Sequence, residues 1–423
     1  MSGGTGGTPP DPTDLDPTTP DPATLDPTTP DPADPAALLA ALVRCPSVTP
    51  DEGGALDLLE RVLRPLGFEV HRPVFSAPGT PDVENLFATR AGSGPHLAFA
   101  GHTDVVPPGD AGAWRHPPFA AAVEDGTLYG RGAEDMKGGV AAFVAAVARA
   151  LRDGTLRGPV SLVITGDEEG PAVNGTRPLL EWAAARGHRF DACVVGEPTN
   201  PEAIGDAIKV GRRGSVTGEL TVEGRQGHAA YPHRADNPVR GMAVLLDALL
   251  REPLDAGTDR FEPTNLEVTS VDVGNSATNV IPGTARALFN VRHNDTWTDA
   301  TLRAEIERRL RTAAEAPSPL RKADGPIRWR VGWREPSSPC FLTHDEALIG
   351  TLAAAVEAET GRRPALSTGG GTSDARFIKD HCPVVEFGLV GRSMHQVDEH
   401  VPLHELDALT AIYARFLAAF GAR

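Results

Sequence analysis

Histidine and acidic side chains follow several short apolar segments of this 423-residue sequence. His102 and Asp104 come after the segment HLAFAG, and Glu168 and Glu169 come after VSLVITGD. Glu197 follows the segment DACVVG in the same way. Imidazole nitrogens and carboxylate oxygens are ligands of Zn²⁺, and a carboxylate that binds no metal can take a proton from an attacking water molecule. The residue types therefore indicate metal-assisted hydrolysis.

Two further candidate ligands lie in loops. Asp135 lies in YGRGAEDMKGG, where two glycines before it and two after it let the backbone approach an ion closely. His395 lies in SMHQVDE, ahead of the last predicted helix. A single H-x-D pair is equally typical of an ordinary surface, whereas the glycines around Asp135 favour a functional loop. Two histidines and three carboxylates together favour a pair of metal ions, which one carboxylate can bridge at roughly 3.5–4 Å.

Such ligands need a rigid scaffold, and the sequence around them alternates between apolar runs and amphipathic segments. The apolar runs 96–101, 160–167 and 191–198 predict strands, and the segments 138–151 and 177–186 predict helices. Alternating strands and helices are typical of an α/β domain with a mostly parallel sheet. Ligands bind such sheets at the carboxyl ends of the strands, which is where the candidate residues lie.

Residues 215–333 follow a different pattern. The predicted order is strand, helix, strand, strand, helix, strand, at 216–222, 238–250, 265–273, 284–291, 299–314 and 327–331. This β-α-β-β-α-β order is the ferredoxin-like α+β arrangement. We expect it to form a separate inserted domain, so that residues 36–214 and 334–423 are the two parts of one catalytic domain.

The first 35 residues have a low-complexity composition. The segment LDPTTPDPA occurs twice, at 15–23 and 25–33, and large apolar side chains are nearly absent. Such a composition cannot build a core, so we expect residues 1–35 to be a disordered or polyproline-like tail.

Composition and charge exclude several classes of protein. The formal net charge of −17 at pH 7 repels a phosphate backbone, so no nucleic-acid partner is expected. No apolar run is long enough to cross a membrane and no signal peptide is recognisable, so we expect no membrane partner and a cytoplasmic location. The four cysteines form no C-x-x-C pair, which argues against a disulfide scaffold and a thiolate zinc site.

The segments GHTDVVP, GRGAEDMKGG, TGDEEG, GEPT and MHQVDE resemble, in order, the motifs of the M20 family of zinc peptidases and deacylases. The resemblance extends over residues 36–423 and implies two Zn²⁺ ions per subunit, with Co²⁺ as an alternative metal. It implies that Asp135 bridges the two ions. His102 and Glu197 would complete one site, and Glu169 and His395 the other.

The same resemblance implies the roles of three further residues. Glu168 is expected to be the general base, and Asp104 to orient His102. His228 in GRQGHAAYPH resembles the histidine that family members supply from the inserted domain of the neighbouring subunit to stabilise the oxyanion. The resemblance therefore implies a homodimer, with residues 215–333 as the dimerisation domain.

Polar side chains at the edges of the inserted domain and in a glycine-rich loop are candidates for binding a small anionic substrate. Guanidinium groups suit carboxylates, and successive backbone N–H groups can cradle them. The candidates are Arg212, Asn279, Arg292, Gly371, Thr372 and Ser373. The loop STGGGTSDARF resembles that of the family's desuccinylases, which hydrolyse N-succinyl-LL-diaminopimelate. His293 departs from the apolar residue expected after Arg292.

Two other functions remain open at this stage. An acetylornithine deacetylase or related aminoacylase of the same family would share the metal site and have a smaller acyl pocket. A catalytically silent relative, acting as a binding protein, would have lost a ligand or the base, yet all of these residues are present.

Overall fold

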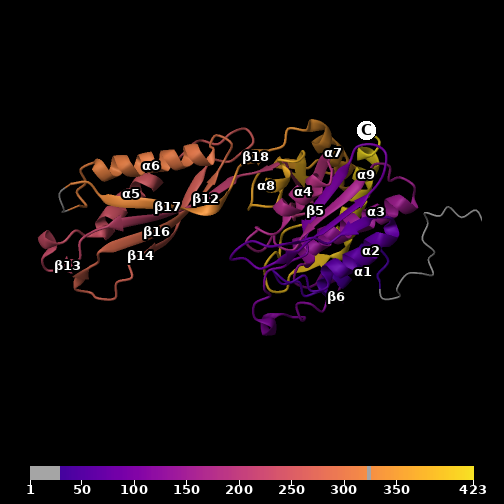
Figure 1. Cartoon of the computed structure of the whole chain (residues 1–423), viewed down its shortest axis with the longest axis horizontal. Helices are drawn as coiled ribbons and strands as arrows, with labels where there is room; N and C mark the ends of the chain where they lie inside the picture. Colours follow the sequence, from indigo (N-terminus) through magenta and orange to yellow (C-terminus); the bar gives the residue numbers. More distant parts are fainter. Residues whose placement is uncertain (1–28, 322–324) are drawn as a thin grey trace, which may run out of the picture. The chain divides into compact units, whose positions relative to one another are not determined.

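The computed structural model describes residues 29–321 and 325–423 (Figure 1). The chain forms two compact units. One comprises the chain up to Asp191 together with Leu389–Arg423, and the other comprises Ala192–Gly388. The first unit is therefore discontinuous in sequence, and the second unit is longer than the predicted insertion of residues 215–333.

The core of the first unit is built on two buried parallel strands. Strand β5 (Leu97–His102) pairs with β8 (Val160–Thr165), and all side chains of both strands are buried. Strands β4 (Leu86–Arg90) and β1 (Glu69–His71) extend this sheet with antiparallel pairing. Strands β5 and β8 match two of the predicted strands and are mostly apolar, because a sheet covered on both faces needs apolar side chains on both.

Helices cover this part of the sheet. Helix α3 (Gly138–Arg152) packs against α9 (Leu403–Phe420) and α1 (Pro35–Val43). The Phe99 ring of β5 stacks on Phe143 of α3 at 4.2 Å between centroids, and both meet Tyr413 of α9 edge-on. The remaining helices of this unit are α2 (Ala55–Leu63) and α4 (Thr176–Ala185).

The second unit contains four paired strands of its own. Strand β9 (Ala192–Val195) runs parallel to β20 (Val384–Glu386), which pairs antiparallel with β10 (Ala207–Lys209). Strand β19 (Ala365–Ser367) runs parallel to β10. Within this unit the order of these strands is β9-β20-β10-β19. The predicted α/β fold with a mostly parallel central sheet is confirmed.

The predicted inserted segment forms a four-stranded antiparallel sheet. Its strands are β12 (Gly214–Glu223), β14 (Asn265–Asp272), β16 (Thr284–His293) and β17 (Arg328–Ser338). Their order, β14-β16-β12-β17, is the ferredoxin-like order that the sequence predicts. Helices α5 (Pro238–Leu250) and α6 (Asp299–Glu315) lie along one face of this sheet (Figure 1). Their apolar stripes form the core with Leu220, Phe289 and other buried residues.

Short elements connect these layers. The two-residue ribbons pair β2 (Val74–Phe75) with β3 (Val83–Glu84), β11 (Gly211–Arg212) with β18 (Phe341–Leu342), and β13 (Gly227–His228) with β15 (Val280–Ile281). A three-stranded sheet contains β6 (Ala122–Glu124), β7 (Thr127–Tyr129) and β21 (His400–Pro402). Helices α7 (Glu346–Thr360) and α8 (Ala375–Ile378) complete the fold. Among the described residues, no helix is long and apolar enough to span a membrane.

Most of the predicted tail, residues 1–28, lies outside the described residues. The end of that segment belongs to the folded unit. Ala33 accepts a hydrogen bond on its carbonyl oxygen from Arg149 Nε at 3.0 Å. Asp34 caps helix α1 by accepting hydrogen bonds from the backbone of Ala36 and Ala37, and Pro35 is already helical. Residues 33–35 of the predicted tail therefore belong to the folded unit.

Deleting residues 2–28 should leave the melting temperature and activity unchanged, because their composition provides few side chains to bury. Extending the deletion through Pro35 should destabilise the protein by ~1 kcal/mol or more, because it removes the Asp34 cap. Thermal denaturation of the two truncated chains beside the full chain measures the difference. A lower melting temperature after the shorter deletion would show that residues 2–28 contribute to the fold.

Candidate metal centre

The parallel pairing of β5 and β8 places two groups of candidate residues at the same edge of the sheet. His102 is the last residue of β5 and lies opposite Thr165, the last residue of β8. Asp104, in the loop after β5, forms hydrogen bonds with the loop that follows β8. Its Oδ1 accepts a hydrogen bond from the backbone N–H of Glu168 at 3.4 Å, and its Oδ2 accepts one from Glu169 at 3.0 Å. The predicted base and its neighbouring ligand are thus held by the buried Asp104 carboxylate.

Asp104 also contacts His102, mainly through its backbone. The Nδ1 of His102 lies 2.8 Å from the Asp104 carbonyl oxygen and 3.7 Å from Asp104 Oδ1. In the neutral tautomer that donates from Nδ1, the Nε2 lone pair would be the one that binds a metal ion. The prediction that Asp104 orients His102 therefore needs a refinement, because the carbonyl makes the shorter contact. Burial raises the pKa of the Asp104 carboxyl to about 6 against the lowering effects of His102 and the two N–H groups.

Asp135 lies between the two predicted histidine ligands. Its Oδ1 is 3.3 Å from His102 Nε2, and its Oδ2 is 3.2 Å from His395 Nε2. His395 Nε2 also lies 2.8 Å from Glu169 Oε1. Each oxygen of one carboxylate thus faces a different imidazole.

The negative charges of Asp135 and Glu169 favour a positive charge between them, as the pKa shifts of Asp135 and His395 show. Burial would raise the pKa of Asp135, but the hydrogen bonds with His102 and His395 outweigh it and hold that pKa below its usual range. The carboxylates of Asp135 and Glu169 raise the pKa of His395 to about 10. A set of carboxylates that stabilises a proton this strongly can equally bind a divalent cation, which competes with that proton.

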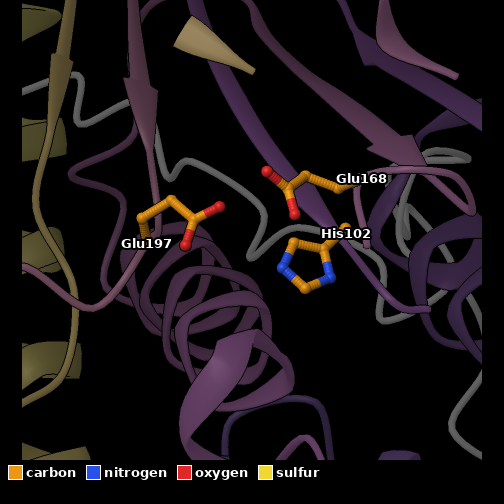
Figure 2. Close-up of side chains that lie close together, drawn as sticks. All are labelled: His102, Glu168 and Glu197. Atoms are coloured by element: carbon orange, nitrogen blue, oxygen red, sulfur yellow. The ribbon is translucent and has the colours of Figure 1, made fainter. Parts of the chain in front are cut away.

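Two overlapping groups of side chains have the spacing of metal ligands. In the first, one ligand atom each from His102, Asp135 and Glu169 lie within 4.8 Å of one another. In the second, the same holds for His102, Glu168 and Glu197. Figure 2 shows the carboxylates of Glu168 and Glu197 both directed towards the His102 ring. The nitrogen and oxygen donors fit zinc, and no cysteine takes part.

The predicted metal ligands His102, Asp135 and Glu169 lie close together in the structure, and Glu168 lies beside them. Glu168 has the spacing of a ligand as well as of a base.

The inserted domain places His228 and Asn279 on one short ribbon. His228 pairs with Val280, and the Ala229 N–H donates to the Asn279 carbonyl oxygen at 2.8 Å. The Ala230 N–H donates to His228 Nδ1 at 3.0 Å. Nδ1 is therefore an acceptor, so the neutral imidazole carries its proton on Nε2 and can donate it outward.

Arg292 is half-buried beside a second guanidinium. Burial lowers the pKa of Arg292, and the positive charge of Arg213 lowers it further. Arg213 is paired with Glu262 at 3.4 Å. His293, which alternates with Arg292 along β16, is buried beside Gly214, where a Cβ would meet the imidazole. The departure at His293 therefore lies on the opposite side of the strand from the Arg292 side chain.

The Arg212 and Ser373 side chains both contact the buried Glu386 carboxylate. The Arg212 guanidinium is buried and binds both carboxylate oxygens of Glu386, and it donates to the Gly371 carbonyl oxygen at 3.0 Å. The Ser373 hydroxyl donates to Glu386 Oε1 at 2.6 Å. These contacts connect the glycine-rich loop to Arg212 and Glu386. Gly371 and Thr372 remain candidates for contacting a substrate.

Two buried carboxylates near the metal ligands were not predicted. Glu134 precedes Asp135, and Glu399 lies four residues after His395. Both lie inside segments that were singled out, and charged residues that are buried need a specific partner. That they are buried is visible only in the structure.

Comparisons with known proteins agree with this geometry. Residues 98–419 match the sequence profile described as peptidase family M20/M25/M40. Aminopeptidase PepT from Bacillus cereus has a TM-score of 0.72 at 20% identity, with coverage of 93% of this chain and 99% of that chain. An M20 family metallo-carboxypeptidase from Sulfolobus solfataricus has a TM-score of 0.71 at 16% identity, with coverage of 91% and 98%. YXEP from Bacillus subtilis, described as a dinuclear metal-binding peptidase of the M20 family, has a TM-score of 0.64 at 18% identity, with coverage of 92% and 97%.

Identities at this level show a shared fold, whereas the sequence profile spans most of the chain. The chain therefore belongs to peptidase family M20/M25/M40.

Proposed function

We propose that this chain is a two-metal amidohydrolase that cleaves N-succinyl-LL-diaminopimelate into LL-diaminopimelate and succinate. The observation that carries the hydrolytic part is the position of Asp135, with one oxygen towards His102 and the other towards His395. A carboxylate in this position can give one oxygen to each of two metal ions. The Bacillus subtilis relative described as dinuclear supports the same interpretation.

Two Zn²⁺ or Co²⁺ ions would polarise the amide carbonyl and provide a water molecule with a pKa near 7. His102, Asp135 and Glu197 would hold one ion, and Asp135, Glu169 and His395 the other. The buried His102 and Asp135 fix the shared part of the site, because neither can turn away into solvent.

The two adjacent carboxylates in the loop after β8, Glu168 and Glu169, have different proposed roles. Glu169 faces His395 and is the proposed ligand. Glu168 is the proposed base, which takes a proton from the attacking water and passes it to the leaving amine. Asp104 supports this division by holding both backbone N–H groups, and thereby the direction in which each side chain leaves the loop.

His228 is the proposed donor to the oxyanion, contributed by the neighbouring subunit of a homodimer. The hydrogen bond from Ala230 to Nδ1 supports this role, because it keeps the proton on Nε2. The side chain is exposed in the chain as it stands. An exposed donor with a fixed tautomer suits a site that a second chain completes.

Replacing His228 by alanine should lower kcat by about 10²–10³-fold, the usual effect of losing an oxyanion donor. Mixed dimers of His228→Ala and Glu168→Gln chains should regain part of the activity, because each mixed dimer contains one intact site. Steady-state kinetics before and after mixing and reassembly measures the recovery. Absence of recovery, with mixed dimers shown to form, would place His228 in the site of its own chain or outside catalysis.

The charges of the inserted domain support an anionic substrate. Arg292 is half-buried near Arg213, whose own anionic partner is Glu262, and a substrate carboxylate beside Arg292 would offset the repulsion between the two guanidinium groups. A guanidinium can bind a carboxylate with two parallel hydrogen bonds. N-succinyl-LL-diaminopimelate carries several carboxylates, including one on the acyl group.

A second substrate class has its own support. Acetylated amines such as N-acetylornithine need the same metal chemistry but have no acyl carboxylate. Peptides are a third class, because solved relatives are named as an aminopeptidase and a carboxypeptidase. A side-by-side assay of succinylated, acetylated and peptide substrates tests the proposal.

A further inference from the structure

The segments that carry Asp135 and His395 hold each other through two buried carboxylates. One segment runs from strand β7 through Gly130 to Lys137, and the other from Ser393 to β21. They meet where β7 pairs with β21, with His400 opposite Tyr129. Each segment sends one glutamate side chain to the backbone of the other.

Glu134 extends from the Asp135 segment to the His395 segment. Its Oε1 accepts hydrogen bonds from the backbone N–H groups of Ser393 and Met394 at 3.2 and 3.1 Å. Its Oε2 accepts a hydrogen bond from the Ser393 N–H at 2.9 Å and another from the Ser393 hydroxyl. The Glu134 carboxylate thus fixes the two residues that precede His395.

Glu399 extends in the opposite direction. Its Oε1 accepts hydrogen bonds from the N–H groups of Glu134 and Asp135 at 3.0 and 3.1 Å. Its Oε2 accepts one from the Gly132 N–H at 3.0 Å and one from Arg131 Nη1 at 2.6 Å. The Glu399 side chain is fully buried, so Arg131 balances its charge inside the protein.

We propose that Glu134 and Glu399 are positioning residues that set the affinity of the metal ions, resting on the two-metal function proposed above. Glu134 holds the backbone beside His395, so its loss weakens the ion that His395 binds. Glu399 holds the backbone N–H of Asp135, which is the shared ligand, so its loss weakens both ions. Partners that orient metal ligands typically change metal affinity by about 10–100-fold when they are removed.

The same Glu→Gln substitution has opposite expected outcomes at the two positions. In Glu134→Gln an amide oxygen at the Oε1 position can still accept from the N–H groups of Ser393 and Met394. The NH₂ at the Oε2 position can donate to the Ser393 hydroxyl, so only the second, shared contact of the Ser393 N–H is lost. In Glu399→Gln the NH₂ group must face either the Glu134 and Asp135 N–H groups or Gly132 and Arg131, all of which are donors. Two donors that face each other in a buried site are destabilising.

The experiment titrates the chelator-treated full chain with Zn²⁺ against a chromophoric chelator, which gives both dissociation constants. Glu134→Met has a similar shape and no acceptor, and it should weaken one ion about 10–100-fold and leave the other near the wild-type value. Glu134→Gln should bind both ions like the wild type. Glu399→Gln should weaken both ions.

A control separates positioning from general destabilisation. Ser161→Ala removes a buried side chain that bonds to Thr89 and His96 in strand β8, away from the metal ligands. It should lower the melting temperature and leave both zinc affinities unchanged. If Glu134→Met does not fold, Glu134→Asp, which withdraws the carboxylate by one methylene, should give the same selective loss.

The possible results have distinct meanings. Wild-type affinity for both ions in a folded Glu134→Met or Glu134→Asp chain would overturn the proposal, as would equal loss of both ions from that chain. Unchanged affinities in Glu399→Gln would overturn its second part. A wild-type chain that binds fewer than two Zn²⁺ ions would instead refute the two-metal function.

Discussion

Replacing Glu168 by glutamine is expected to lower kcat by roughly 10²–10⁴-fold, the usual contribution of general acid–base catalysis. Glutamine keeps the size and polarity of the side chain but cannot take the proton from the attacking water. The backbone N–H of residue 168 still donates to Asp104, so the loop keeps its position. Zinc content should remain near the wild-type value. Steady-state kinetics together with elemental analysis of the purified chain measure both quantities.

Glu169→Gln is the matched control, because it makes the same chemical change at the next residue. Glu169 lies 2.8 Å from His395 Nε2 and is a proposed ligand, so this variant should lose zinc as well as activity. Glu168 also lies close enough to His102 and Glu197 for the three side chains to bind one metal ion together. Loss of zinc from Glu168→Gln would therefore make it a ligand, and a different group would have to act as the base.

The scaffold of this site follows from local patterns in the sequence. Buried parallel strands are apolar throughout, and they end where a turn begins, so the positions of His102, Glu168 and Glu169 at one edge of the sheet were predictable. The ferredoxin-like domain was predictable for a related reason. Its β-α-β-β-α-β order of elements admits few arrangements, and the observed order β14-β16-β12-β17 is the usual one.

The contacts that decide what each polar residue does were not predictable, because they join distant parts of the chain. Arg212 resembled a substrate-binding arginine, but Glu386, 174 residues later, takes up its charge. Glu399 contacts the backbone of Glu134 across 265 residues. The periodicity of apolar residues in the sequence does not indicate which distant residues form such contacts. Only the folded chain shows that the Arg212 guanidinium is paired with a buried carboxylate.

N-succinyl-LL-diaminopimelate should be hydrolysed with a kcat/KM far above that of N-acetylornithine, by roughly 10⁴-fold in the most favourable case. The physical reason is the acyl carboxylate. A site whose buried cation is bound by that carboxylate rejects an acetyl group, which leaves the cation without a partner. Parallel assays of both compounds and of a dipeptide, with the same zinc-loaded preparation, give the three values.

Arg292→Ala should reduce this preference mainly by weakening the succinylated substrate, with little change for the acetylated one. Arg286→Ala is the matched control, because Arg286 lies on the same strand, β16, and on the same face, but is exposed to solvent. It should leave both values unchanged, since an exposed guanidinium is compensated by water. Equal turnover of both substrates, or faster turnover of acetylornithine, would assign the chain to the acetyl-specific alternative, and a preference for the dipeptide would assign it to the peptidases. In either case the two-metal mechanism would stand, because the pairing of Asp135 with His102 and His395 does not depend on the acyl group.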